Sequence, residues 1–339
     1  MSDGLSLNER STRLVESLGL ASASEVRAVE PLAGGVSSDI AVVDLGERKV
    51  CVKFALERLK VRADWYAPVR RNAAEYRWLE FASRVVRDSA PRLLGRDSEL
   101  NGFAMEYIDG QGTYLWKKAL LEQRPHGGEA SSVGDTLGRI HSASATSTID
   151  HTLFQNQRDF SQLRVDPYFR FTMSRHPDRT RSLQRRIDAL SRHELVLLHG
   201  DVSPKNILFR NGRPILLDAE CATMGDPAFD VAFCANHLIL KAIHMPEHAE
   251  TLLVEVAEFW SAYAQHCSWE NVELLESRVC ETLPALMLAR VDGKSPVEYL
   301  AGATRELVRE YAREQLVRPA TSVSELLGMV RDASRRSTR

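Results

Sequence analysis

The chain has 339 residues, of which 44% are hydrophobic and 27% charged, and its formal net charge is −2. This length is enough to bury a sizeable core in two lobes, and the composition is ordinary for a globular protein. The near-zero net charge gives no electrostatic reason to expect nucleic acid or an anionic membrane as a partner. The sequence contains no run of about 18 apolar residues, so a transmembrane helix is not expected.

The first part of the chain predicts a small sheet accompanied by helices. Residues 5–19 have the spacing of a short amphipathic helix, and residues 26–106 alternate strand-like runs with one helical segment. Between two of these runs, Gly34, Gly35 and Ser37 could present backbone N–H groups to phosphates. A glycine- and serine-rich turn of this kind is also common where no ligand binds.

The run 49–54 alternates as a strand would, which places Lys53 on the face opposite its apolar residues. The segment 71–81 has helical composition and contains Glu75 and Glu80. Either Glu75 or Glu80 could form an ion pair with Lys53. Alone, each of these charges is also explained as a solvated residue.

A second apolar strand is predicted in residues 102–110, and it ends in the sequence Glu-Tyr-Ile-Asp-Gly. Beyond it, apolar residues fall increasingly at helical spacing. Helices are expected at residues 133–141, 182–191, 230–242, 247–266, 270–289, 296–317 and 322–335, and a loop-rich polar region at residues 151–178.

The segment around Asp201 carries the residue types that phosphoryl transfer needs, which are a proton acceptor and metal ligands in fixed positions. Asp201 begins a loop after the apolar run 195–198, where a substrate hydroxyl could reach its carboxylate. Asn206, five residues further on, offers an amide oxygen. Mg2+ prefers such oxygen ligands, so the loop predicts both a base and a metal site.

The residues that follow predict a hairpin, with Asn211 and Gly212 at its turn. The returning strand ends at Asp218 and Glu220, which the hairpin would bring back beside Asn206. Since these two acids are two positions apart, their side chains would share one face of an extended segment. Both could therefore point at the same metal ions.

The motif His-Gly-Asp ending at Asp201, followed by Asn206 and Asp218, resembles the aminoglycoside phosphotransferase and choline kinase family. The run Gly-Asp-Pro-x-x-Asp at residues 225–230 fits the same family. The resemblance implies that Asp201 is the catalytic base and that Asn206 and Asp218 bind Mg2+. Asp230, which ends the second run, and His199 of the first motif are expected to be structural.

The same resemblance implies roles for residues in the first part of the chain. Lys53, positioned by Glu75, would contact the α- and β-phosphates of ATP. Met105 would gate the adenine pocket. The backbone of Glu106 and Ile108 would form hydrogen bonds with adenine.

A closer resemblance is to the methylthioribose kinase branch of this family. It rests on Trp65, Arg71 and Glu75 in the first part of the chain, and on the pair Asp218 and Glu220. In that branch both acids are implied in metal binding, so Glu220 is a further candidate ligand. The catalytic loop sequence Ser-Pro-Lys-Asn departs from that branch, and the chain is shorter.

Four charged residues are candidates for the acceptor site. Lys205 lies on the loop that would face the acceptor, and a cation there suits a neutral or anionic acceptor better than a polycationic aminoglycoside. Arg290, Asp292 and Lys294 lie between two long predicted helices, and the resemblance favours Arg290. Residues 295–298 instead read as a helix N-cap, a first-turn proline and a capping-box acid.

The expected fold is α+β and protein-kinase-like. Residues 1–106 would form an N-lobe with an antiparallel sheet and one helix, and residues 107–339 a larger, mainly helical C-lobe. The expected reaction moves the γ-phosphoryl group of Mg·ATP to a hydroxyl of a small acceptor, such as a sugar, in a monomer or homodimer. The alternatives are an aminoglycoside O-phosphotransferase and a non-catalytic nucleotide-binding regulatory protein. The acceptor and the preference for ATP or GTP stay open.

Cysteine usage bears on the location of the protein. The five cysteines are scattered and lie mostly in apolar contexts, and no set of Cys and His has zinc-ligand spacing. The first ten residues lack the basic and apolar regions of a signal peptide. These features predict reduced thiols and a cytoplasmic location.

Overall fold

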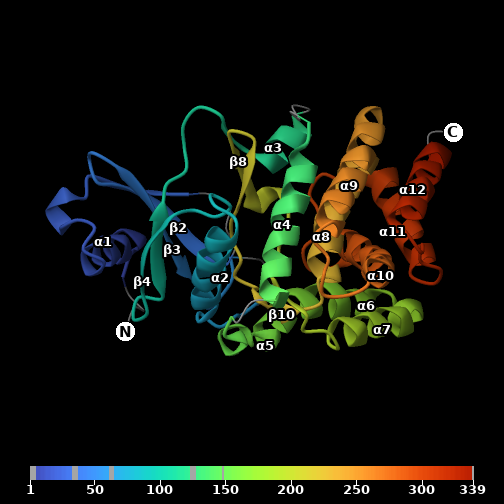
Figure 1. The fold of residues 1–339 in the computed structure, drawn as a ribbon, viewed down its shortest axis with the longest axis horizontal. Helices are drawn as coiled ribbons and strands as arrows, with labels where there is room; N and C mark the ends of the chain where they lie inside the picture. The colour runs from blue at the N-terminus through green and yellow to red at the C-terminus, as the bar shows by residue number, and fades with distance from the viewer. Residues whose placement is uncertain (1–4, 33–36, 61–64, 123–126, 147–148, 338–339) are drawn as a thin grey trace.

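The computed structural model describes residues 5–32, 37–60, 65–122, 127–146 and 149–337. A small sheet with its helices lies at one end of the molecule, and a larger helical part lies at the other (Figure 1). This arrangement is the predicted α+β, protein-kinase-like fold. The division of the chain at residue 106, where the last strand of the small sheet ends, stays a prediction.

The N-terminal sheet is antiparallel and has five strands in the order β1-β2-β3-β5-β4. Its strands are β1 (Ala28–Pro31), β2 (Ser38–Asp44), β3 (Lys49–Ala55), β4 (Leu93–Asp97) and β5 (Gly102–Glu106). Alternate side chains of β3 point to opposite faces. Val50 and Val52 pack with α1 (Leu7–Ser17), whereas Cys51 packs with α2 (Arg71–Val85). The face of α2 is therefore also the face of Lys53, as the alternation predicts.

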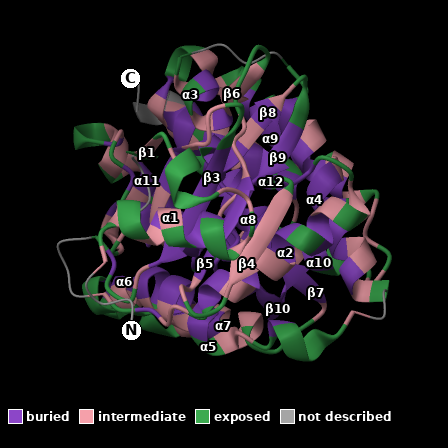
Figure 2. Ribbon diagram, turned by 90° about the vertical axis from the view of Figure 1, so that its left-hand side faces the viewer, coloured by how far each residue is buried: buried purple, intermediate pink, exposed green. Residues whose placement is uncertain are grey.

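The helical part is built around α8 (Ala228–His244), in which every residue except His244 is buried. Figure 2 shows buried segments through the middle of the molecule and exposed ones around them. The other helices are α3 (Trp116–Leu121), α4 (Glu129–Thr146), α5 (Gln157–Phe160), the π-helical segment Ser161–Arg170, α6 (Phe171–Arg175), α7 (Thr180–Leu190), α9 (Ala249–Ala264), α10 (Val272–Asp292), α11 (Gly302–Gln315) and α12 (Val323–Ser337).

Two small sheets carry the central motif. The strands β7 (Val196–Leu198) and β10 (Thr223–Gly225) pair with each other, and β6 (Thr113–Leu115), β8 (Ile207–Arg210) and β9 (Arg213–Leu216) form the second sheet. The predicted hairpin is confirmed, since β8 and β9 are antiparallel neighbours. Asn211 and Gly212 at its turn have φ angles of 52° and 76°, which Asn and Gly tolerate best.

Two predictions about secondary structure are wrong. Residues 151–178 are not mainly loop, because residues 157–175 are helical and bury Phe160, Leu163 and Phe169 against the core. The helix expected at residues 296–317 begins only at Gly302. Its expected N-cap, Ser295, instead receives hydrogen bonds from the Arg290 guanidinium on both its carbonyl and its hydroxyl oxygen.

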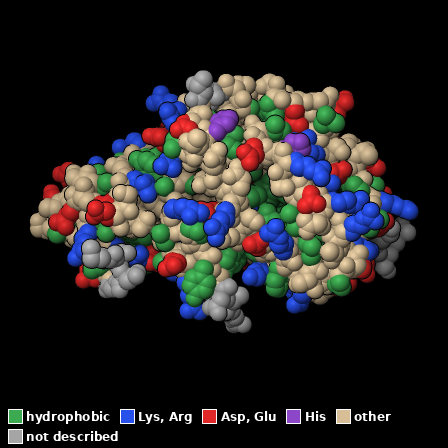
Figure 3. Space-filling view, turned by 90° about the horizontal axis from the view of Figure 1, so that it is seen from below, with side chains coloured by type: hydrophobic (Ala, Val, Ile, Leu, Met, Phe, Trp, Pro, Cys, Tyr) green, Lys and Arg blue, Asp and Glu red, His purple; other side chains and the backbone are tan. Residues whose placement is uncertain are grey.

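The surface carries charges of both signs, in keeping with the small net charge. On the face drawn in Figure 3, basic and acidic side chains are interspersed. None of the helices in the described ranges combines the length and the apolar character that crossing a membrane requires.

Candidate active site

A cavity of about 710 Å³ lies between the N-terminal sheet and the helical part, and both contribute to its lining. Most of the residues singled out from the sequence line it together: Ser37, Lys53, Glu75, Met105, Glu106, Ile108, Asp201, Lys205, Asn206, Asp218, Glu220, Arg290 and Lys294. Gly34 and Gly35 lie outside the described residues. Asp292 is not part of the lining.

The loop after β7 is held by hydrogen bonds to a carboxylate of α8. The Asp230 carboxylate accepts hydrogen bonds from the backbone N–H groups of His199, at 2.7 Å, and Gly200, at 2.9 Å. The His199 Nδ1 atom accepts the Asp201 N–H, so its Nε2–H donates to the Leu217 carbonyl at 3.0 Å. Burial lowers the pKa of His199, which keeps this imidazole neutral. His199 and Asp230 therefore brace the loop.

Gly200 is needed where the loop turns. Its φ angle is +79°, and a Cβ atom there would lie 2.6 Å from the Cβ of Cys221. We expect Gly200→Ala to lower the free energy of unfolding by about 2 kcal/mol or more, through backbone strain and overpacking. Denaturant unfolding measures this. The matched control is Gly212→Ala, which has a similar φ but no atom within 4 Å of the added Cβ. Equal losses in both variants would mean that the close approach to Cys221 is unimportant.

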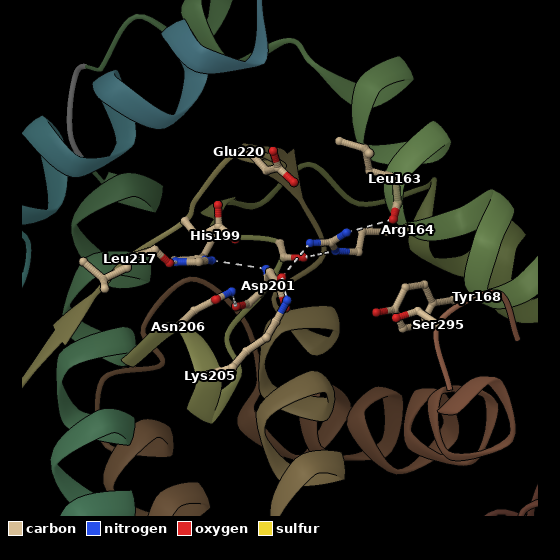
Figure 4. A network of polar contacts seen from close by, with 12 residues as sticks. Leu163, Arg164, Tyr168, His199, Asp201, Lys205, Asn206, Leu217, Glu220 and Ser295 are labelled. Atoms are coloured by element: carbon tan, nitrogen blue, oxygen red, sulfur yellow. Dashed lines mark hydrogen bonds and ion pairs between the residues drawn. The ribbon is translucent and has the colours of Figure 1, made fainter. Parts of the chain in front are cut away.

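The Asp201 carboxylate is the most constrained group in the site (Figure 4). Its Oδ2 atom lies 3.0 Å from an Arg164 nitrogen and 3.1 Å from the Lys205 Nζ. Its Oδ1 atom is buried and has no hydrogen-bond partner in the part of the chain that the structure describes. Burial alone would raise the pKa of Asp201, but Lys205 and Arg164 outweigh it and hold the pKa well below its ordinary value. The carboxylate is therefore ionised and has one oxygen free to accept a proton.

Lys53 and Glu75 form the predicted ion pair. The Lys53 Nζ lies 2.7 Å from a Glu75 carboxylate oxygen and also contacts Asp218. Burial would lower the pKa of Lys53, but the carboxylates of Asp218 and Glu75 raise it above its ordinary value, so Lys53 is charged. The competing candidate, Glu80, is half exposed and lies 3.7 Å from Arg84 instead.

Three residues offer oxygen atoms that fit a magnesium ion. The Asn206 Nδ2–H group donates to the Asp201 carbonyl at 3.1 Å, which leaves the amide oxygen of Asn206 for another partner. Asp218 ends the hairpin with a φ of 67° and keeps a quarter of its side chain exposed. Glu220 uses one oxygen for Arg71, at 3.0 Å. Among the described residues no group of three or more His, Cys, Asp or Glu could hold a metal ion.

Asp292 has a structural environment outside the cavity. Its carboxylate lies 2.9 Å from His176 Nε2 and accepts hydrogen bonds from Arg309 at 2.7 and 2.8 Å. Arg290, two positions earlier in α10, is turned toward the cavity and donates to the Tyr168 hydroxyl at 3.2 Å. The structure thus separates two residues that the sequence placed together.

Among the cavity residues that were not predicted from the sequence are Arg164 and Lys241. Arg164 comes from the π-helical segment, which reads as loop in the sequence, and its partner is 37 positions away. Lys241 lies in α8 and is only 1% exposed. A single lysine near the end of a mostly apolar helix was a usable signal, because a lysine is seldom fully buried unless it is paired.

Comparisons with known proteins bear on the family of the chain. Residues 28–266 match the profile of the phosphotransferase enzyme family, APH. Methylthioribose kinase of Bacillus mycoides is 23% identical in an alignment of 256 residues, which covers 66% of this chain and 64% of that protein. The chain thus spans less than two thirds of the length of this relative.

Two solved structures share the fold over nearly their whole length. A choline/ethanolamine kinase family protein from Mesorhizobium loti is 18% identical, with a TM-score of 0.58 over 95% of this chain and 98% of that one. An amicoumacin kinase in complex with AMP-PNP, Ca2+ and Ami is 14% identical, with a TM-score of 0.59 over 95% of this chain and 100% of that one. At these identities the likeness establishes the fold. Because the family profile covers more than half of its length, the chain belongs to the phosphotransferase enzyme family.

Proposed function

We propose that the chain is a kinase that transfers the γ-phosphoryl group of Mg·ATP to a hydroxyl of a small polar acceptor. The observation that carries this proposal is the Asp201 carboxylate. One of its oxygens is held by Arg164 and Lys205, and the other is buried without a donor. A buried oxygen that accepts no hydrogen bond is costly to the fold. The hydroxyl group of the substrate could donate a hydrogen bond to it.

The N-terminal sheet supplies the groups that would bind the phosphates. Lys53 is charged and is fixed by Glu75, so its ammonium group is positioned for the α- and β-phosphates. Ser37 lines the same end of the cavity at the start of β2, next to the predicted loop containing Gly34 and Gly35. We assign this end to the triphosphate.

The end of β5 supplies the adenine pocket. Met105 is 9% exposed and lines the cavity beside Glu106 and Ile108. Their main chain follows directly on the strand that pairs with β3, the strand of Lys53. This continuity supports a nucleotide whose base and phosphates lie along a single wall.

The chemical step exchanges one P–O bond for another. The acceptor oxygen bonds to the γ-phosphorus, the bond to the oxygen that stays with ADP breaks, and the hydroxyl proton passes to Asp201 Oδ1. Asn206, Asp218 and Glu220 would hold Mg2+, which neutralises charge on the phosphates when bound. Since its pKa is low, Asp201 orients the hydroxyl throughout and takes the proton late, which suits a loose transition state.

The comparisons support this assignment. The curated relative is named as a methylthioribose kinase, which favours a sugar or a similar polyol as the acceptor. A structural neighbour was solved with the ATP analogue AMP-PNP and a divalent cation. Both fit an acceptor hydroxyl at Asp201 and a nucleotide along Lys53.

The metal dependence tests the proposal. ADP release in the presence of acceptor should stop with excess EDTA and return with Mg2+. Asp218→Asn should raise the Mg2+ concentration for half-maximal rate by about tenfold or more, because the site loses a charged ligand. Asp88→Asn is the matched control, since Asp88 has nearly the same φ, 66°, but lies outside the cavity lining. Turnover in excess EDTA, or equal Mg2+ curves for both variants, would refute the metal assignment.

A further inference from the structure

One end of the cavity carries an excess of positive charge. We call it the acceptor end. It is lined by Leu163, Arg164, Tyr168, His237, Lys241, Arg290 and residues 294–299. Its only acid among these described residues is Glu298, which pairs with Lys117 of α3. Arg164 is neutralised by Asp201. Lys241, Arg290 and Lys294 form no ion pair with a carboxylate in the described parts of the chain.

Lys241 is the most unusual of these cations. It is 1% exposed, and among the described residues its Nζ contacts only the His237 backbone carbonyl, at 3.3 Å, and the ring of Tyr299, with the centroid 5.4 Å away. Burial, reinforced by the charges of Lys117 and Arg290, lowers the pKa of Lys241 to about 7. A buried ammonium group that faces a cavity and lacks a counter-charge is set up to receive one from a ligand.

Arg290 points the same way. It is 8% exposed, and its described partners are neutral oxygens, those of Tyr168 and Ser295. Its Nε–H group is buried and has no hydrogen-bond partner in the described structure. Because Arg binds carboxylate and phosphate through paired N–H donors, this guanidinium can complete its bonding with an anion.

Shared neighbours connect the two cations to the reacting end. The centroid of the Tyr168 ring lies 5.8 Å from the guanidinium carbon of Arg290 and 6.0 Å from that of Arg164, the ion-pair partner of Asp201. His237 is one helical turn before Lys241, and the charges of Arg290, Lys241, Asp201 and Lys205 all act on it. One acceptor can therefore place a hydroxyl at Asp201 and a second group at Lys241.

We propose that the acceptor carries an anionic group, a carboxylate or a phosphate, which binds to Lys241 and Arg290 while its hydroxyl faces Asp201. This inference rests on the proposed kinase function and narrows it to one class of acceptor. The walls between these points include Leu163, Tyr168 and Val297, which suit a compact carbon frame. A polycationic acceptor would meet three unpaired cations and is disfavoured.

The test compares acceptors that share one frame and differ in charge. The two panels are glucose, glucuronate and glucose 6-phosphate, and glycerol, glycerate and glycerol 3-phosphate, each assayed for phosphorylated product with Mg·ATP. An acidic member should exceed its neutral partner in kcat/KM by about 10- to 100-fold, the usual worth of one charged hydrogen bond. Whether the carboxylate or the phosphate is preferred identifies the anion. Lys241→Met should lower the ratio of kcat/KM for acidic over neutral members severalfold, because Arg290 alone then holds the anion.

The control variant is Lys118→Met, which removes an exposed lysine of α3 outside the cavity and should keep the ratio. Equal or better use of the neutral members, or a ratio unchanged in Lys241→Met, overturns the inference. If no member is phosphorylated, calorimetric binding of glucuronate and glucose 6-phosphate decides. Binding that is lost in Lys241→Met supports the anion site, and binding that is absent or independent of Lys241 overturns it.

The same experiments separate this inference from the function on which it rests. A chain that fails to bind Mg·ATP contradicts the kinase proposal itself. A chain that binds Mg·ATP and phosphorylates only neutral or cationic members keeps the kinase function and loses the anionic acceptor.

Discussion

Replacing Asp201 by Asn is expected to lower kcat by about 10³-fold or more. The amide keeps the shape of the carboxylate but cannot take the hydroxyl proton. It also removes the charge that now balances Arg164 and Lys205, two cations beside the reacting hydroxyl. The ionised carboxylate is favoured by both neighbours, as the lowered pKa of Asp201 shows, so the loss is one of chemistry and of orientation together.

Binding separates this effect from a general loss of structure. Mg·ATP affinity, measured by titration, should stay close to that of the unmodified protein, because Lys53 and the β5 wall are untouched. A second readout is the pH dependence of kcat in the unmodified protein. It should show no titration of Asp201 in the neutral range, because the pKa of this carboxylate is low. A variant with nearly full turnover would mean that another group accepts the proton.

Lys241→Met is expected to make the protein more stable, even though it removes a proposed binding residue. The pKa of Lys241 falls from its ordinary 10.5 to about 7 on folding, because of burial and of Lys117 and Arg290. At about 1.36 kcal/mol per pKa unit, the charged form costs the fold roughly 5 kcal/mol. Methionine has a similar length, carries no charge and fits the apolar surroundings of α8.

The pH dependence of this gain has a definite sign. Below about pH 7 Lys241 is protonated in both the folded and the unfolded chain, so the whole penalty applies. Between about pH 7 and 10.5 folding releases a proton, and the penalty shrinks as pH rises. In denaturant unfolding, the free energy of unfolding of the variant should therefore exceed that of the unmodified protein by roughly 5 kcal/mol at pH 6 and by roughly 2 kcal/mol at pH 9. A variant that is less stable at pH 6 would mean that the fold itself compensates this charge.

The groups that could be predicted from the sequence are those whose partners are set by local structure. The hairpin returns Asp218 to the vicinity of Asn206 because its turn residues and strand lengths fix the register. Lys53 faces α2 because strand side chains alternate. Glu75 could be proposed as its partner only through the family resemblance, since nothing in a helix marks which of two glutamates meets a strand lysine.

The rest of the site depends on contacts between distant parts of the chain. No local pattern shows that Arg164 reaches Asp201, because a π-helical turn has no simple sequence period. The expected helix N-cap at Ser295 failed for a related reason. The capping pattern was present, but the Arg290 guanidinium occupies the oxygens of Ser295, so the helix starts later. Tertiary contacts decided both cases.

In the π-helical segment Ser161–Arg170, the number of residues before Arg164 decides where its side chain points. Successive side chains on a helix are turned by a regular angle about its axis, about 100° in an α-helix, so the loss of one residue would swing Arg164 around the axis. Asp201 would then lose its buried counter-charge from Arg164, although every named residue remained in the chain. At this site, a one-residue deletion is a larger chemical change than most substitutions. A percentage of identical residues does not reveal such a one-residue deletion.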